Sequence, residues 1–235
     1  MTFDDSFTLT IAGESVTTSA QVDVINPATG KVFATAPAAD AALLDRAVAA
    51  AGAVFPQWRD TPLEERRQAL LALADAIEDK AGAFGALFTR EQGRPLALAT
   101  REIVAGATWL RAVAGQDVAI DIVEDSAARR VEVHHVPLGV VAAIVPWNFP
   151  FLLTIWKIAP ALLTGNTVVL KPSPYTPLCA LKLGELASTI LPGGVLNVVS
   201  GDDSLGPSLS AHPGGAKLSF TGSTATGKRV MEAAA

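Results

Sequence analysis

The spacing of hydrophobic and polar residues changes about halfway along the chain, which divides it into two parts. In the first part, an alternating stretch at residues 21–25 and another through Val32 and Phe33 predict two short strands joined by a turn at Asn26-Pro27. Longer stretches then follow the helical period, and they predict helices at residues 40–54, 63–77, 83–91 and 97–114. The first part is therefore expected to be mainly helical.

The second of these helices has a start signal in the sequence Thr61-Pro62-Leu63-Glu64. A hydroxyl residue followed three positions later by glutamate is typical of a capping box, and proline is favoured at the first helical position. We therefore expect Thr61 and Glu64 to cap the backbone N–H groups of this helix.

The second part begins near residue 128 and alternates strand-like with helix-like stretches. Val131 and Val133 alternate with polar residues, which predicts a half-buried strand. Residues 139–145 form a continuous apolar run, as expected of a strand covered on both faces. The remaining pattern predicts helices at 152–163, 177–190, 204–211 and from 223, with strands at 167–170, 195–199 and 217–220. This alternation is typical of βαβ units and predicts an α/β fold with a parallel sheet.

Composition excludes several classes of protein. Half of the 235 residues are hydrophobic and 17% are charged, so the chain is not expected to be disordered. A single cysteine excludes a disulfide framework and a cysteine zinc cluster, and suits a reducing compartment. The net charge of −5, without a basic run, argues against a nucleic-acid surface.

Targeting signals are also missing from the sequence. Residues 1–10 have no basic region and no apolar core, so they do not resemble a signal peptide. Residues 138–156 are strongly apolar, but Pro146 and Pro150 would break a membrane-spanning helix at its middle. We therefore expect a cytoplasmic protein without membrane partners.

Three predicted strand ends carry residues that could bind a ligand, because ligands of open α/β sheets bind beyond the carboxyl ends of the strands. After the first strand, Asn148 lies between Pro146 and Pro150, and its side-chain amide is a donor suited to an oxyanion. The alternative is an Asx-turn with a purely structural role. After the next strand, Lys171 could bind a phosphate or a ribose hydroxyl, with Ser173 beside it; the alternative is a solvated lysine.

The third strand end is Phe220-Thr221-Gly222-Ser223, which opens the last predicted helix. Glycine allows the backbone to approach a ligand, and a helix start favours an anion. The alternative is that Ser223 or Thr224 only caps the helix. Residues 222–228 spell most of a P-loop, but Arg229 stands where a hydroxyl residue should hold Mg²⁺, which argues against a triphosphatase.

Other candidate chemistry is weaker. His134 and His135 are adjacent on a predicted strand, so they point to opposite faces and cannot share a metal ion. His212 is expected in a loop. Cys179 lies in an apolar predicted helix without a histidine nearby, which favours a buried structural thiol over a nucleophile. No metal site is predicted.

Taken together, the motifs resemble those of the aldehyde dehydrogenase superfamily, and the resemblance covers essentially the whole chain. They occur in the family's order at residues 26–30 (NPATG), 58–59 (WR), 64–70, 91–95 (EQGRP), 146–150 (PWNFP), 165–173 (GNTVVLKPS) and 220–224 (FTGST). The resemblance implies a Rossmann-like parallel sheet with flanking helices, preceded by a mainly helical segment. It also implies NAD(P)-dependent oxidation of an aldehyde to a carboxylic acid.

The resemblance assigns roles to particular residues. It implies that Asn148 stabilises the oxyanion and that the cofactor, NAD or NADP, is bound along the three strand ends. The implied cofactor residues are Ile144, Val145, Pro146, Trp147, Lys171, Ser173, Pro174, Gly201, Gly206, Phe220, Thr221, Gly222 and Ser223. Lys171 would hold the adenosine ribose, and Gly222 and Ser223 would approach the pyrophosphate.

The sequence departs from the family pattern in two ways. Many NAD-preferring members have a glutamate three residues after the lysine, and Pro174 occupies this position here, so the choice between NAD and NADP stays open. The family's general-base glutamate and nucleophilic cysteine are expected beyond residue 235. We therefore interpret residues 1–235 as an incomplete NAD(P)-binding domain, with a helical part at 1–115, a strand connection at 116–137 and a βα nucleotide-binding part at 138–235.

Two functions remain open on this interpretation. In the first, the chain is the cofactor-binding part of an aldehyde dehydrogenase, inactive without the remainder, and the partner is a small aldehyde of unspecified structure. In the second, it is a non-catalytic nucleotide-binding or interaction module from a truncated gene. A full-length family member is expected to be a homo-oligomer, whereas the missing C-terminal strand leaves assembly of this chain open.

Overall fold

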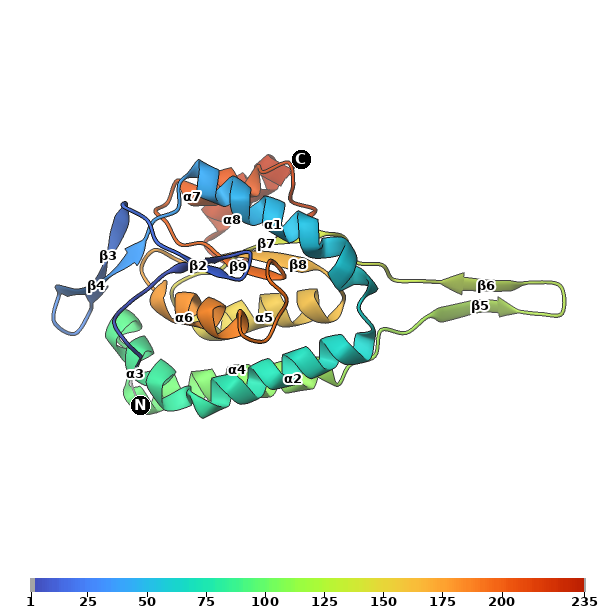
Figure 1. Cartoon of the computed structure of the whole chain (residues 1–235), viewed down its shortest axis with the longest axis horizontal. Helices are drawn as coiled ribbons and strands as arrows, with labels where there is room; N and C mark the ends of the chain where they lie inside the picture. Colours follow the sequence, from blue (N-terminus) through green and yellow to red (C-terminus); the bar gives the residue numbers. More distant parts are fainter. Residues whose placement is uncertain (1–2, 235) are drawn as a thin grey trace.

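The centre of the molecule is a six-stranded sheet with the order β10-β7-β8-β9-β1-β2 (Figure 1). The computed structural model describes residues 3–234, so the expectations about the two chain ends that involve Met1, Thr2 and Ala235 lie outside it. Strands β7 to β10 run parallel, as predicted, whereas β1 pairs antiparallel with β9 and β2 pairs antiparallel with β1. The strands are β1 (Leu9–Ile11), β2 (Glu14–Val16), β7 (Val140–Ile144), β8 (Thr167–Lys171), β9 (Leu196–Val198) and β10 (Lys217–Phe220).

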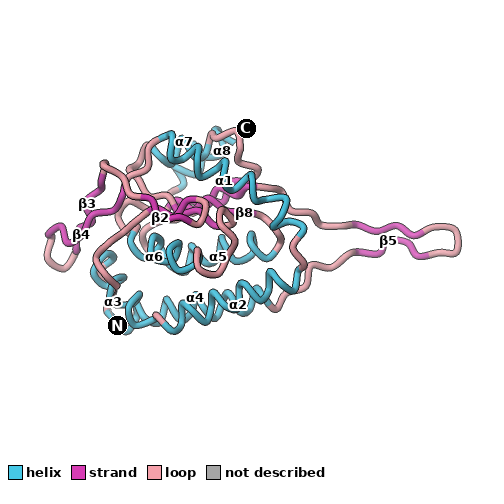
Figure 2. The backbone as a smooth tube through the Cα atoms, in the orientation of Figure 1, coloured by secondary structure: helices cyan, strands magenta, loops and turns pink. Residues whose placement is uncertain are grey.

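Helices cover both faces of this sheet (Figures 1 and 2). Helices α1, α7 and α8 lie on one face, and α5 and α6 lie on the other. Helices α2, α3 and α4 form a further layer outside α5 and α6. The helices are α1 (Ala41–Asp60), α2 (Leu63–Asp79), α3 (Ala81–Gln92), α4 (Leu96–Ala114), α5 (Pro150–Leu163), α6 (Leu178–Ala187), α7 (Leu205–Ser210) and α8 (Thr224–Ala234). The predicted helices are all present, which confirms the α/β fold.

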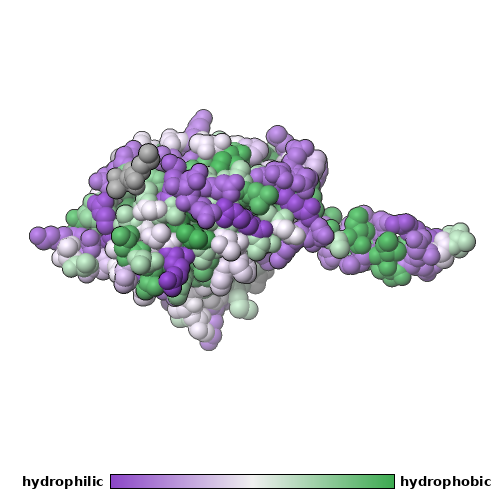
Figure 3. Space-filling model, turned by 90° about the horizontal axis from the view of Figure 1, so that it is seen from below, coloured by the Kyte–Doolittle hydropathy of each residue, from purple (hydrophilic) through white to green (hydrophobic). Residues whose placement is uncertain are grey.

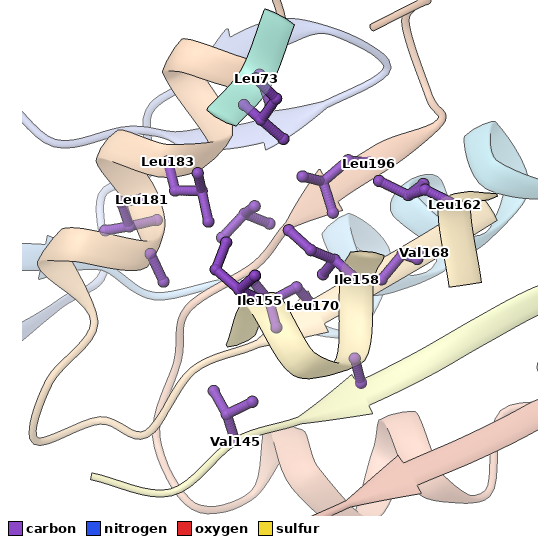
Figure 4. Close-up of a cluster of buried hydrophobic side chains, with 14 of the residues drawn as sticks. Leu73, Val145, Ile155, Ile158, Leu162, Val168, Leu170, Leu181, Leu183 and Leu196 are labelled. Atoms are coloured by element: carbon purple, nitrogen blue, oxygen red, sulfur yellow. The ribbon is translucent and has the colours of Figure 1, made fainter. Parts of the chain in front are cut away.

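Figure 4 shows the part of the core that lies between β8 and β9 on one side and α5 and α6 on the other. Ile155 and Ile158 of α5 are fully buried against Val168 and Leu170 of β8. Burying each such side chain contributes about 1.5–3 kcal/mol. This packing fixes the ends of β7 and β8, and it therefore fixes the position of the residues that follow these strands.

The start of α2 differs from the prediction. The helix begins at Leu63 as expected, but no side chain caps it, and the capping box is wrong. Thr61 ends α1 instead, and its Oγ1 donates to the carbonyl of Gln57 at 2.9 Å. The Glu64 carboxylate accepts from Gln68 rather than reaching back to Thr61. The Thr61 hydroxyl is hydrogen-bonded to the end of α1, so it is not available to cap the start of α2.

Two hairpins lie outside the central sheet. The first joins β3 (Gln21–Asn26) to β4 (Lys31–Pro37), as predicted. The second joins β5 (Asp121–Asp125) to β6 (Arg130–Val133) and extends away from the body of the molecule (Figure 1). Val131 and Val133 are exposed on it, so the prediction of a half-buried strand is wrong. The alternating pattern is present, but nothing within residues 3–234 covers the apolar side of this hairpin, where green side chains lie at its surface (Figure 3).

Within residues 3–234, no helix is both long enough and apolar enough to span a bilayer. The apolar stretch 138–156 divides into β7, a turn and the first half of α5, in agreement with the interpretation of its two prolines.

Candidate functional site

A cavity of about 760 Å³ lies at the carboxyl ends of β7, β8 and β10. Because the three strands are parallel neighbours, the residues that follow them converge on one edge of the sheet. The turn after β7, the residues after β8 and the start of α8 form most of its walls, and α7 closes the remaining side. The three strand ends identified in the sequence therefore contribute to one site.

Asn148 lies in the turn between β7 and α5, and its side chain is exposed at the cavity. Its amide makes no hydrogen bond with another group in the part of the chain that the structure describes, so no Asx-turn is present. Two side chains hold its backbone instead: Arg94 Nη2 donates to the Asn148 carbonyl at 2.9 Å, and Gln92 Nε2 lies 3.5 Å from the same oxygen. The main chain of Asn148 is thus held in place, and its side-chain amide is free to meet a ligand.

Arg94 is itself held by a buried carboxylate. It pairs with Glu102 of α4, whose side chain is only 3% exposed, and it stacks on the Phe149 ring at 4.3 Å. The other oxygen of Glu102 accepts from the Leu152 backbone N–H at 3.1 Å, in the first turn of α5. Burial raises the pKa of Glu102, against the opposing effects of the Leu152 hydrogen bond and the Arg94 charge. One ion pair therefore supports the turn on both sides of Asn148.

Lys171 ends β8 and is buried, so the alternative of a solvated lysine is wrong. Its Nζ donates to the Pro172 carbonyl at 3.2 Å, which leaves two N–H donors for a ligand. Burial lowers the pKa of Lys171, while the nearby negative charges of Asp203 and Asp202 oppose this effect. Ser173 is buried beside it and also lines the cavity.

The start of α8 forms the wall opposite. Ser223 Oγ accepts from the Thr226 backbone N–H at 3.2 Å, so Ser223 caps the helix as the structural alternative proposed. Gly222 adjoins the Phe220 ring so closely that a Cβ would lie 2.4 Å from Phe220 Cζ. A side chain at position 222 would therefore force the Phe220 ring to move, which favours glycine at this position.

The structure places most of the residues named from the sequence around this cavity, with one exception. Gly201 does not line it, because it packs under Leu205 and beside the Ala39 carbonyl. The cavity brings together Asn148, Ile144, Val145, Pro146, Trp147, Lys171, Ser173, Pro174, Gly206, Phe220, Thr221, Gly222 and Ser223. It also includes residues that sequence reasoning missed, namely Asp203, Pro207, Ser210, Thr226, Arg229, Val230 and Ala233.

Cys179 lies outside the cavity, in the first turn of α6. It is 1% exposed, and burial raises the pKa of its thiol well above the usual value. The neighbouring Glu91 of α3 accepts from the backbone N–H groups of Leu178 at 2.7 Å and Cys179 at 3.1 Å. Cys179 is thus the buried structural thiol predicted from the sequence, and Glu91 supplies the cap of α6.

Glu91 should make stability depend on pH. Burial raises its pKa to about 7, despite the hydrogen bonds that favour the carboxylate. Between pH 4.5 and 7 the folded chain then binds more protons than the unfolded chain, so the free energy of unfolding falls as pH rises. We expect Glu91 to contribute a decrease of roughly 2–3 kcal/mol between pH 4.5 and pH 8.

Urea unfolding at several pH values measures this effect. Glu91→Gln should remove the decrease, because its amide does not titrate. It should also lower stability, because an NH₂ group replaces one of the two oxygens that accept from Leu178 and Cys179. Glu65→Gln on the exposed face of α2 is the control and should leave the pH profile unchanged. A Glu91→Gln profile parallel to that of the unmodified chain would contradict the prediction.

The histidines take no part in the site. His134 and His135 are exposed and lie near Glu132 at 2.8 Å and Asp121 at 3.3 Å, and His212 contacts Asp45 at 3.0 Å. Within residues 3–234, no three His, Cys, Asp or Glu side chains are grouped as metal ligands.

Comparison with known proteins places this arrangement in one family. The model of the aldehyde dehydrogenase family matches residues 15–235. The aldehyde dehydrogenase LUC3 of a Fusarium species is 43% identical over 208 residues, which are 88% of this chain and 44% of that protein. Phenylacetaldehyde dehydrogenase of Pseudomonas fluorescens is 42% identical over 226 residues, which are 90% of this chain and 45% of that protein.

Solved structures agree with the sequence relatives. The structure of PnpE in complex with nicotinamide adenine dinucleotide matches with a TM-score of 0.93 and 39% identity, covering 97% of this chain and 48% of that one. The chain spans about half the length of the relatives it matches. With the family match over residues 15–235 and this shared fold, the chain belongs to the aldehyde dehydrogenase family.

Proposed function

We propose that this chain forms the nicotinamide cofactor site of an NAD(P)-dependent aldehyde dehydrogenase and supplies the amide that stabilises the oxyanion. The observation that carries the proposal is the single cavity shared by Asn148, Lys171 and the start of α8. An oxidation of an aldehyde to a carboxylic acid requires a hydride acceptor and a donor to the oxyanion at one place. Lys171 and the start of α8 could hold the cofactor that accepts the hydride, and Asn148 could supply the donor.

The cavity has unused polar groups that suit a dinucleotide. Lys171 has spare donors, and Ser210 Oγ is buried in the wall without a hydrogen-bond partner among the described residues. A ribose hydroxyl and an adenine ring nitrogen are suitable partners for them. The start of α8 beside Gly222 favours an anion, so we assign the pyrophosphate to this wall and the adenosine ribose to Lys171.

The residues of this chain would contribute to catalysis by stabilising the developing negative charge on the substrate. The bound cofactor would accept the hydride that leaves the aldehyde carbon. The Asn148 amide would donate to the aldehyde oxygen as negative charge develops on it, and Arg94 holds the main chain that carries this amide. The nucleophile is assigned to the part of the enzyme outside residues 1–235, because Cys179 is buried in α6.

A turnover assay tests this division of labour. The 235-residue chain, supplied with NAD and a panel of aldehydes, should produce no NADH, whereas the protein from the complete reading frame should. Robust NADH production by the chain alone would overturn the assignment. A reading frame without a downstream Glu-Leu-Gly-Gly motif and cysteine would instead favour the non-catalytic nucleotide-binding module.

Lys171→Met should weaken NAD binding by roughly 10- to 100-fold, because hydrogen bonds from a charged donor contribute about 1.5–3 kcal/mol. Isothermal titration of the chain measures the change. Lys217→Met, an exposed lysine on β10 outside the cavity, is the matched control and should leave affinity unchanged. Equal losses in both variants would mean that Lys171 acts only through the overall charge.

The hairpin of β5 and β6 supports the proposal that the full-length enzyme is a homo-oligomer. Ile122 is 53% exposed and Val123 is 66% exposed on an arm that projects from the body (Figure 1). Exposed apolar side chains on such an arm are typical of a surface that another protein covers, and we assign this role to a second copy of the enzyme.

A further inference from the structure

We propose that Asp203 makes this site select NAD over NADP. The inference rests on the proposed function and extends it to the choice of cofactor. The question arises at Pro174, where the sequence has no carboxylate to bind the hydroxyls of the ribose. The structure provides a carboxylate from a different element, the residues that lead into α7.

Asp203 faces the same part of the cavity as Lys171. Both residues line it, together with Ser173, Pro174 and Gly206. Helix α7 packs directly beside the lysine, since a Cβ on Gly206 would lie 4.0 Å from Lys171 Cε. The charge of Asp203 also counteracts the effect of burial on the pKa of Lys171, as expected of a carboxylate near the ammonium group. The cation that would hold the adenosine ribose therefore has an anion beside it.

The two neighbouring aspartates have different roles. Asp202 Oδ1 accepts from the backbone N–H of Ser204 at 2.9 Å and from its hydroxyl at 2.5 Å, and Asp202 does not line the cavity. Asp203 is exposed to the cavity, and its carboxylate has no hydrogen bond or ion pair with residues 3–234. Both of its oxygens can therefore accept from a ligand.

These properties distinguish the two cofactors at the 2′ position of the adenosine ribose. In NAD this position is a hydroxyl, which can donate to the Asp203 carboxylate while its oxygen accepts from Lys171. In NADP it is a phosphate, which has no proton to donate near neutral pH and carries negative charge next to Asp203. Repulsion between the phosphate and the Asp203 carboxylate should reduce the affinity for NADP by about tenfold or more.

Among residues 3–234, Arg229 is the one cation besides Lys171 in the cavity wall, and it could favour a phosphate. It lies on α8, on the same helix as the Ser223 cap and Thr226, where the pyrophosphate is assigned. Asp203 lies with Lys171 at the wall where the ribose is assigned. We therefore expect Arg229 to affect the affinities for NAD and NADP equally.

Titration of the 235-residue chain with NAD and NADP tests the inference, and 5′-AMP and 2′,5′-ADP serve as shorter probes of the same contact. We expect NAD to bind at least about tenfold more tightly than NADP, and 5′-AMP more tightly than 2′,5′-ADP. Asp203→Asn should bring each pair within about threefold, chiefly by strengthening the phosphorylated ligand. Because the preference is electrostatic, raising the ionic strength to about 0.5 M should reduce it in the unmodified chain.

Two matched variants separate Asp203 from its neighbours. Asp202→Asn keeps the contacts with Ser204 and should change the ratio of affinities by less than Asp203→Asn. Arg229→Met should leave the ratio unchanged. Equal binding of NAD and NADP, or an Asp203→Asn ratio equal to that of the unmodified chain, would overturn the inference and leave the proposed function intact. If none of the four ligands binds, the proposed cofactor site and the inference both fail.

Discussion

Asn148→Ala should reduce kcat by about 10²–10³ in the enzyme from the complete reading frame, with little change in the affinity for the cofactor. The reason is that the side-chain amide makes no hydrogen bond with the rest of the described chain, while Arg94 Nη2 donates to the Asn148 backbone carbonyl at 2.9 Å. Removal of the amide therefore costs no native hydrogen bond and removes only the donor to the oxyanion. Steady-state NADH formation measures the loss, and titration of NAD measures the cofactor affinity.

A second asparagine provides the control for this prediction. Asn26 Oδ1 accepts from the Ala28 backbone N–H at 2.9 Å in the turn between β3 and β4, so Asn26 forms the kind of Asx-turn that Asn148 does not form. Asn26→Ala should lower stability and leave kcat nearly unchanged. Asn148→Asp should be at least as damaging to kcat as Asn148→Ala, because a carboxylate repels the developing oxyanion. If Asn148→Ala keeps kcat within about threefold, Asn148 does not stabilise the oxyanion.

The sequence predicted the fold well where local pattern and packing agree. The apolar run of β7 and the helical period of α5 each fit a single kind of element, because helices cover β7 on both faces and α5 packs one side against the sheet. The hairpin of β5 and β6 shows the limit. Alternation at Val131 and Val133 indicates a strand, but only the position of the strand in space decides whether it is buried.

The candidate site shows the same division. Residues that follow a predicted strand, such as Asn148 and Lys171, could be identified because the sheet edge brings them together. Asp203 could not be identified from the sequence, because its position near the cofactor site depends on how closely α7 packs beside Lys171. Glu102 could have been identified from the sequence as a buried charge. It is a carboxylate on the apolar face of a helix, next to Ile103, and such a residue needs a buried partner. The partner, Arg94, could not be chosen from spacing alone.

Arg94→Ala should reduce the free energy of unfolding by about 3–5 kcal/mol, because it leaves the Glu102 carboxylate buried without its cation. The loss should be smaller at pH 5 than at pH 8. Glu102 already has a raised pKa through burial, and removal of the arginine raises it further. The folded variant then binds a proton that the unfolded chain releases, so the stability of the variant falls as pH rises. Urea unfolding of the chain at both pH values measures this difference.

Replacement of both partners separates the buried charge from the loss of packing. The double variant Arg94→Met and Glu102→Gln keeps the volume of both side chains and removes both charges, so it should recover most of the stability that Arg94→Ala loses. Arg94→Lys should lie between them, because lysine keeps the charge but cannot contact Glu102 and the Asn148 carbonyl with one planar group. If the double variant were as unstable as Arg94→Ala, the lost stability would come from packing against Phe149, and the ion pair would not be what supports the turn at Asn148.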